Sequence, residues 1–262
     1  MVVRIGFLFA SVAFVVIVLA GSLVNAGPAA SIYLPSIPFS ASPTPTPTPM
    51  PTTFTDDFSN PSSGWPVTDD SVATTGYLNG EYQILIKQMN FIVRAGHSYQ
   101  ASDFQVQVDA RDASNTNGSV GLYFGSVTNV GYYDFEVAFG QFYLGRYDLS
   151  TNTSTSIISP TTSSAILSGN ATNHLKATRS GSTITLYANG TQLAQVVDST
   201  LGFGFIGLAA TSFSPNFDAR FDNFALIEAA PAVVVQSSAG RSNDGVDVSP
   251  RPALPRWSNQ AR

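Results

Sequence analysis

The chain has 262 residues, only 11% of them charged, and no cysteine. The lack of cysteine excludes disulfides, thiolate metal sites, a cysteine nucleophile and a lipid-modified cysteine anchor. Segment 54–229 carries 15 Asp or Glu against 7 Lys or Arg. Because this acidic balance repels phosphate backbones, it argues against nucleic acid as a partner.

The N-terminus begins with an unbroken apolar run at residues 5–24, directly after Arg4. Two interpretations stay open. Val24-Asn25-Ala26 forms a small-x-Ala cleavage site, which predicts a signal peptide over residues 1–26. Twenty apolar residues can also cross a bilayer as the helix of an uncleaved signal anchor. Both predict an exported protein, secreted or at the cell surface, that meets the membrane only through residues 5–24.

Both flanks of the central segment predict irregular structure. Residues 27–53 form a Pro/Thr-rich linker in which proline occupies every second position from 43 to 49, so an extended spacer is expected. Residues 230–262 contain four prolines and little apolar periodicity, which predicts a disordered tail. A short docking motif at Arg256-Trp257 is the alternative interpretation of that tail.

Residues 54–229 show apolar and polar side chains in strict alternation, the pattern of half-buried strands. Asn189-Gly190 adds a strong hairpin signal. No segment has helical periodicity, so an all-β sandwich or barrel with antiparallel sheets is expected. The predicted strands are Glu81–Lys87, Phe104–Ala110, Ser119–Gly125, Tyr132–Ala138, Gln141–Tyr147, Asn173–Arg179, Ser182–Ala188, Thr191–Val197, Gly204–Ala210 and Ala219–Ile227.

Six short motifs follow one another in a familiar order. They are Thr55–Trp65, Gly80–Tyr82, Asn173–Ala177, Ile184–Gly190, Gly207–Ala210 and Phe221–Phe224. This order resembles the concanavalin A-like lectin/glucanase domains, and within them the laminin-G-like and 3-keto-disaccharide hydrolase-like bacterial surface domains. The resemblance implies a two-sheet antiparallel jelly-roll sandwich over residues 54–229. It leaves function open, because lectins, glycosidases and adhesion modules share this scaffold.

A sugar-binding face is the first candidate site. Tyrosines opposite the core positions could stack on sugar rings while polar neighbours bind hydroxyl groups. The alternative is cross-strand tyrosine pairing that only stabilises the sheet. The candidate ligand-binding residues are Tyr123, Tyr132, Tyr143, Tyr187, Gln105, Gln107, Asp109, Asp134 and Glu136.

The acids of Tyr132-x-Asp134-x-Glu136 share one strand face, where alternate residues lie about 6–7 Å apart. The resemblance implies catalytic acids at this alternation in laminarinase-like members, as Glu-x-Asp-x-Glu. Here Tyr132 stands at the nucleophile position, which puts a retaining mechanism in doubt. Asp134 and Glu136 could instead bind sugar or metal, or lie solvated on an exposed face.

Calcium is the one cofactor that the sequence suggests. The resemblance implies that the two end strands of the domain pair, which would bring Asp56, Asp57, Asp222 and Asn223 together. Oxygen ligands of this kind suit a hard cation. The alternative is that these residues cap strands and fill turns; Asp69-Asp70 is a second candidate pair.

We therefore expect an extracytoplasmic carbohydrate-binding module without catalysis, whose partner is a glycan or a cell-envelope polysaccharide. Two alternatives stay open. One is a glycoside hydrolase-like enzyme of the same fold that uses Asp134 and Glu136. The other is a structural or adhesion domain that binds a protein.

Overall fold

The computed structural model describes residues 53–114, 116–228 and 246–250. The predicted signal segment and linker, and most of the tail, lie outside these ranges. Within the described ranges every element is a strand, and no helix there is long and apolar enough to cross a membrane.

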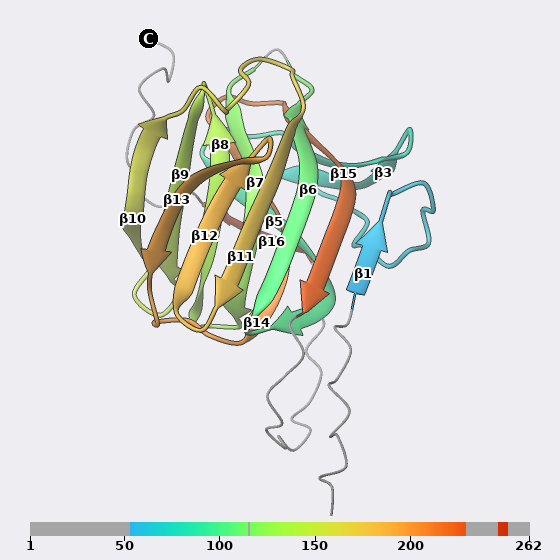
Figure 1. Cartoon of the computed structure of the whole chain (residues 1–262). Coiled ribbons are helices and arrows are strands. Elements are labelled where there is room, and N and C mark those ends of the chain that lie inside the picture. Colours follow the sequence, from blue (N-terminus) through green and yellow to red (C-terminus); the bar gives the residue numbers. More distant parts are fainter. Residues whose placement is uncertain (1–52, 115, 229–245, 251–262) are drawn as a thin grey trace, which may run out of the picture. The chain divides into compact units, whose positions relative to one another are not determined.

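The strands form two antiparallel sheets. Sheet A runs in the spatial order β13 (Thr191–Val197), β12 (Thr183–Ala188), β11 (Asn173–Ser180), β6 (Phe104–Asp112), β15 (Phe217–Glu228), β4 (Glu81–Ile86), β3 (Ala73–Leu78) and β2 (Thr68–Asp69), and β1 (Thr53–Asp56) also pairs with β15. Sheet B runs β10 (Thr153–Thr162), β9 (Gln141–Asp148), β8 (Gly131–Ala138), β7 (Gly118–Val127), β14 (Gly204–Ser212), β5 (Phe91–Ala101) and β16 (Val246–Pro250). Figure 1 shows β6, β11 and β12 of sheet A in front of β7, β8 and β9 of sheet B.

The core lies between the two sheets, as the alternation predicts. Leu122, Phe135 and Leu208 point inward from sheet B, and Leu186 and Phe221 point inward from sheet A. All five are fully buried. Each such side chain contributes roughly 1.5–3 kcal/mol on burial, so the facing apolar rows hold the layers together.

The end strands of the domain pair, as expected from the resemblance. Asp56 of β1 lies opposite Phe224 of β15. The Asp56 carboxylate accepts hydrogen bonds from the Phe58 N–H at 2.8 Å and from the Trp65 indole N–H at 2.9 Å. Trp65 is only 3% exposed. The first motif of the resemblance is therefore a structural turn that fixes a tryptophan in the core.

One prediction of irregular structure is corrected by the structure. Residues 246–250, expected in a disordered tail, form β16 against the edge of β5. The alternating valines at 246 and 248 give this short segment strand character, and it covers an otherwise open sheet edge. A further strand, β10, was not among those predicted, because its Ser- and Thr-rich residues lack an apolar alternation.

Candidate functional site

The face of sheet B that points away from sheet A carries a second set of aromatic and polar side chains. Tyr123, Tyr132, Tyr147, Phe205 and Ala209 form a cluster separate from the main core. We call the face that they share the outer face of sheet B. Its residues are Ile92, Arg94, Gly96, Ser119, Gly121, Tyr123, Tyr132, Asp134, Glu136, Tyr143, Gly145, Tyr147, Phe205, Gly207, Ala209 and Thr211.

Strand register aligns these residues in rows across the sheet. Tyr123 lies opposite Gly207 on one side and Asp134 on the other. In the next row Glu136 lies between Gly121 and Tyr143. The two carboxylates of β8 therefore stand in the middle of the sheet, with tyrosines on neighbouring strands.

Glycines let the tyrosine rings lie down on the sheet. A Cβ atom at Gly96 would meet the Tyr123 hydroxyl at 1.9 Å, and one at Gly207 would meet the same ring at 2.7 Å. A Cβ atom at Gly145 would likewise meet the Tyr143 hydroxyl at 2.2 Å. Each ring occupies the volume that a side chain would fill: Tyr123 reaches across β14 to β5, and Tyr143 lies along its own strand.

Arg94 reaches over this layer from β5. Its guanidinium carbon lies 3.6 Å from the centre of the Tyr132 ring and 5.4 Å from that of Tyr123. A cation over an aromatic face is attractive, most of all where water is excluded. Burial raises the pKa of the Tyr132 phenol, and its hydroxyl has no hydrogen-bond partner among the residues that the structure describes.

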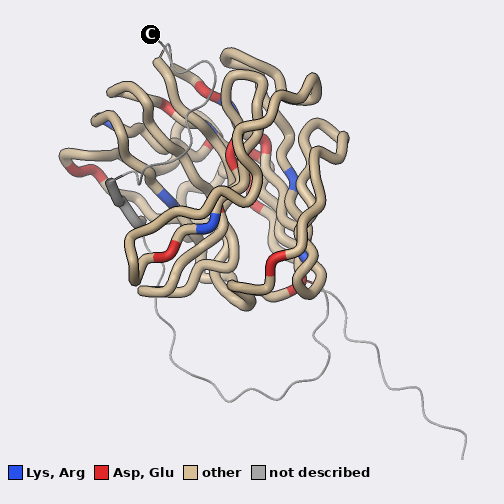
Figure 2. Tube along the Cα trace, turned by 90° about the vertical axis from the view of Figure 1, so that its left-hand side faces the viewer, with Lys and Arg blue, Asp and Glu red and all other residues tan. Residues whose placement is uncertain are grey.

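Glu136 is held by two hydroxyl groups. Ser119 donates to one of its carboxylate oxygens at 2.7 Å, and Thr211 donates to the two oxygens at 2.7 and 3.0 Å. Neutral donors stabilise a carboxylate in a site where water is scarce. Charged residues are sparse along the folded trace (Figure 2).

The expectation that these tyrosines and acids are exposed is wrong. The exposed fraction is 1% for Tyr132 and Glu136, 2% for Tyr123 and Tyr143, and 4% for Asp134. Part of this burial is mutual, because the Tyr132 and Tyr147 rings pack 5.2 Å apart, as the sheet-stabilising alternative expects. The residues do lie outside the core, on one continuous face.

The structure also divides the predicted sugar face in two. Gln105, Gln107 and Asp109 belong to β6, and Tyr187 to β12, so all four lie on the outer face of sheet A. Alternation alone cannot say which sheet a strand joins. The Gln105, Gln107 and Tyr187 side chains are therefore separated by the whole sandwich from Tyr123, Tyr132, Tyr143, Asp134 and Glu136. On sheet A, Tyr187 lies beneath the Lys176 ammonium, which is 4.1 Å from the ring centre.

The predicted calcium ligands are engaged within the protein. Both oxygens of Asp56 accept N–H groups, and Asp57 accepts from Ser59. The Asn223 amide donates to Asp109 at 2.9 Å. Within the described ranges no group of three or more His, Asp or Glu side chains could hold a metal ion. Calcium binding stays a prediction.

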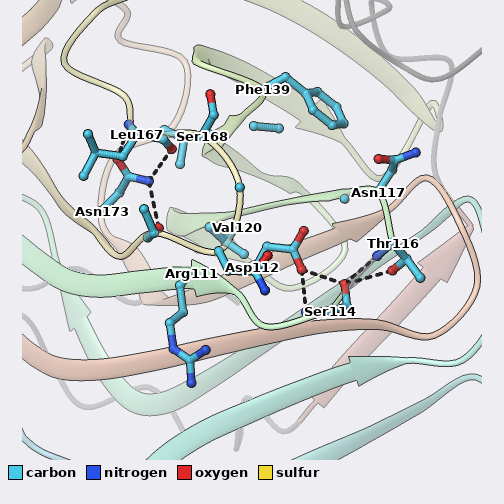
Figure 3. A pocket seen from close by; sticks show the side chains of 16 residues that line it. Arg111, Asp112, Ser114, Thr116, Asn117, Val120, Phe139, Leu167, Ser168 and Asn173 are labelled. Atoms are coloured by element: carbon cyan, nitrogen blue, oxygen red, sulfur yellow. Dashed lines mark hydrogen bonds between the residues drawn. The ribbon is translucent and has the colours of Figure 1, made fainter.

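A hollow of about 250 Å³ opens at one end of the sandwich (Figure 3). The side chains that line it bond to one another: Ser114 donates to Asp112 at 2.6 Å, and Asn173 holds both backbone groups of Leu167. Burial raises the pKa of the Asp112 carboxyl. Among the described residues that line it, Phe139 is the one aromatic side chain, so the hollow offers less to a ring-shaped ligand than the tyrosine layer does.

Sequence reasoning missed Arg94, Ser119 and Thr211 as members of the site. Ser119 and Thr211 stand at non-core positions of strands that were predicted, so extending the alternation would have found them. Arg94 belongs to β5, a strand that was not among those predicted, although Arg94, Ser98 and Gln100 share the face opposite its core residues. Its one charged residue was the available signal.

No protein-family model matches the chain, and neither does any curated protein. Solved structures do. Carbohydrate binding module CBM66 from Bacillus subtilis is similar with a TM-score of 0.51 and 19% identity, over 62% of this chain and 93% of that one. A Bacillus subtilis protein of unknown function with a galectin-like fold has a TM-score of 0.53 and 12% identity, over 70% and 98%. An apo Crh5 transglycosylase has a TM-score of 0.51 and 12% identity, over 70% and 89%.

These similarities show the fold. The described domain is a two-sheet jelly-roll sandwich of the same fold as these structures, which is the fold that the motif order in the sequence suggested. Two of these structural neighbours are a carbohydrate-binding module and a transglycosylase.

Proposed function

We propose that this protein is a carbohydrate-binding module without catalytic activity, and that the outer face of sheet B is its binding site. The fold supports a role with carbohydrate, because one structural neighbour is a carbohydrate-binding module and another a transglycosylase. The choice of face rests on the arrangement of its side chains.

The observation that carries the proposal is the layer of flat tyrosine rings beside two carboxylates. Sugar rings have apolar faces and polar edges, so they bind where an aromatic plane and hydrogen-bond acceptors lie together. Tyr123 and Tyr143 supply the planes, and Asp134 and Glu136 supply the acceptors one strand away. Described residues at the outer face of sheet A and at the end hollow offer no such layer.

The same geometry favours binding over hydrolysis. Tyr132 stands where the resemblance places a nucleophilic carboxylate, and its raised pKa keeps the phenol neutral. Glu136 accepts hydrogen bonds from Ser119 and Thr211, so its carboxylate is ready to accept and poorly placed to donate a proton. A glycosidase needs one carboxyl group that donates a proton to the leaving group.

The test is a glycan array probed with the full chain and with single variants. Asp134→Asn keeps the shape of the side chain and should weaken binding at least about tenfold, since a charge-assisted hydrogen bond contributes roughly 1.5–3 kcal/mol. Tyr143→Ala should abolish binding. Tyr187→Ala, a tyrosine on the other sheet, is the matched control and should bind as the wild type does.

Loss of binding in Tyr187→Ala with retention in Asp134→Asn would move the site to sheet A. Catalysis has its own measurement. Release of reducing sugar from a mixed-linkage β-glucan by the wild type, abolished in Glu136→Gln, would replace binding with hydrolysis as the function.

We also propose that the protein is exported. The apolar run 5–24, followed by a small-x-Ala sequence, supports passage across a membrane. Mass spectrometry of the chain recovered outside the cell distinguishes a cut before Gly27 from a retained anchor.

A further inference from the structure

The end hollow is bounded by three connecting segments: the loop after β6, the turn after β8 and the loop after β10. Both loops are tied to neighbouring parts of the chain. The Thr116 hydroxyl donates to the Asn216 carbonyl at 3.3 Å, and the Asn189 amide donates to the Ala165 carbonyl at 2.8 Å. Because its walls are held in this way, the hollow needs little ordering when a ligand binds, and this favours affinity.

The turn after β8 carries backbone strain. Phe139 and Gly140 both have positive φ, at 53° and 72°, as a two-residue hairpin turn of this type requires. Two other hairpins have the same turn, and they use Asn79-Gly80 and Asn189-Gly190. Asparagine tolerates this conformation, whereas a bulky side chain is strained in it. Phe139 therefore stands where the fold itself favours asparagine.

Core packing does not explain this strain. Phe58, the other phenylalanine with positive φ in the described ranges, is 1% exposed and packs against Trp65. Phe139 is partly exposed, its ring centre lies 6.0 Å from that of Phe213, and it lines the hollow (Figure 3). Strained residues that the surrounding structure holds in place cluster at ligand-binding sites. The strain and exposure of Phe139 thus point to a ligand in the hollow.

The charges around the hollow disfavour an anionic ligand. One oxygen of Asp112 accepts from the Ser114 N–H at 2.8 Å and from its hydroxyl at 2.6 Å. The other Asp112 oxygen accepts no hydrogen bond within the described ranges. Arg111, the one cation among the described lining residues, donates to both oxygens of Glu81, at 2.9 and 2.7 Å. The described lining therefore offers a spare carboxylate oxygen and no unpaired cation.

The other polar side chains of the described lining are neutral hydroxyl and amide groups. Together with one aromatic ring, they suit a sugar residue, which has an apolar face and a polar edge. A quaternary ammonium ligand is bound by a cage of several aromatic faces, and this lining has one. The hollow of about 250 Å³ is smaller than the roughly 300–1,000 Å³ of sites for drug-sized ligands. It has room for one ring.

We propose that the end hollow is a second binding site, which takes one neutral sugar residue, with Phe139 against its apolar face and Asp112 accepting from its hydroxyl groups. Because the hollow holds a single ring, it recognises the end or a branch of a glycan and not the length of a chain. The site does not require the outer face of sheet B to bind glycan.

Amide chemical shifts of the full chain, labelled with nitrogen-15, test the site. The probes are the methyl glycosides of glucose, galactose and mannose, with glucuronate as the anionic counterpart. At least one neutral glycoside should shift amides in residues 112–114, 116–118, 138–140 and 167–171, with a dissociation constant in the millimolar range expected for so small a ligand. Glucuronate should leave them unchanged. No shift at these amides with any neutral glycoside, or an equal shift with glucuronate, overturns the proposal.

Phe139→Asn separates a role in binding from a role in packing. Asparagine relieves the strain of the turn, so the thermal midpoint should stay or rise while the affinity for the glycoside falls at least about fivefold. Asn79→Phe is the matched control: it puts the same strain into a hairpin that does not line the hollow, so it should lower the midpoint and leave the affinity unchanged. A lower midpoint with unchanged affinity in Phe139→Asn would show that the ring only packs on Phe213, and would overturn the proposal.

Asp112→Asn tests the acceptor. It keeps an oxygen for Ser114 and removes the charge, so the affinity for the glycoside should fall roughly fivefold. Asp148 makes the same turn with Ser150, through bonds of 2.9 and 2.6 Å. Asp148→Asn is therefore the matched control and should bind as the wild type does. An equal effect of both substitutions would remove Asp112 from the site.

Tyr143→Ala distinguishes the two proposals. It should abolish glycan binding on the array and leave the shifts around the hollow unchanged. Shifts around the hollow in a protein that binds no glycan on the array would keep this site and remove the proposed function. Array binding without shifts around the hollow would do the opposite.

Discussion

The contact between Gly96 and Tyr123 gives the sharpest test of how the tyrosine layer is built. The Tyr123 ring lies over the sheet because Gly96 has no side chain. In Gly96→Ala the new Cβ atom would meet the Tyr123 hydroxyl at 1.9 Å and its next ring carbon at 3.2 Å, with Ile206 carbonyl oxygen at 3.8 Å. The clash therefore depends almost wholly on one hydroxyl oxygen.

The loss of stability expected in Gly96→Ala follows from overpacking. Inserting a methyl group into filled space destabilises the fold by about 1–3 kcal/mol. Alanine also restricts the unfolded chain more than glycine does, which stabilises the fold by up to about 1 kcal/mol. Gly96→Ala should thus lower the free energy of unfolding by roughly 1–2 kcal/mol. The Tyr123→Phe substitution removes the hydroxyl and leaves only the ring contact at 3.2 Å. In that background most of the cost of Gly96→Ala should therefore disappear.

A double-mutant cycle followed by urea unfolding measures the coupling free energy between Gly96→Ala and Tyr123→Phe, which is expected to be about 1 kcal/mol or more. Gly207→Ala is the matched control. Its Cβ atom would meet the Ala95 carbonyl oxygen at 2.4 Å and a Tyr123 ring carbon at 2.7 Å, neither of which Tyr123→Phe removes. Equal coupling for both glycines, or none for Gly96, would refute the flat placement of the Tyr123 ring.

Three further predictions concern the paired end strands. Asp56→Ala removes the acceptor of the Trp65 indole and should lower the free energy of unfolding by about 2–3 kcal/mol; an unchanged urea midpoint would contradict this. Partial burial first, then repulsion from neighbouring carboxylates, raises the pKa of Asp222, so its ionised form weakens the fold. Asp222→Asn should therefore raise the thermal midpoint at pH 7, and the gain should fade below about pH 4, where the wild-type carboxyl protonates; a gain that persists in acid would speak against this cause. A calcium site at Asp57 and Asp222 predicts that Ca²⁺ added after EDTA raises the midpoint of the wild type and not of Asp57→Asn; the same response in both rejects it.

The sequence predicted the strands well where one face is apolar and the other polar. β6, β8 and β11 follow this pattern, and the side chains that alternation assigned to the core are buried. The motif order added the jelly roll and the pairing of β1 with β15. The alternation and the motif order are both local features of the sequence, so they can be recognised without knowledge of the tertiary structure.

Two features of the site depended on information that alternation does not contain. Whether Gln105 and Tyr123 share a face depends on which sheet each strand joins, and the structure puts them on opposite sides. Exposure depends on what covers a face: Tyr132 and Tyr143 were correctly placed outside the core and are nevertheless buried. A polar strand face therefore predicts that its side chains point away from the core, and it does not predict that they contact solvent.

Hydrogen exchange of the full chain, with and without the glycan identified on the array, tests the central claim most directly. Binding at the outer face of sheet B should slow amide exchange in β7, β8 and β9. Slowed exchange confined to β6, β11 and β12 would place the ligand on sheet A and contradict the account.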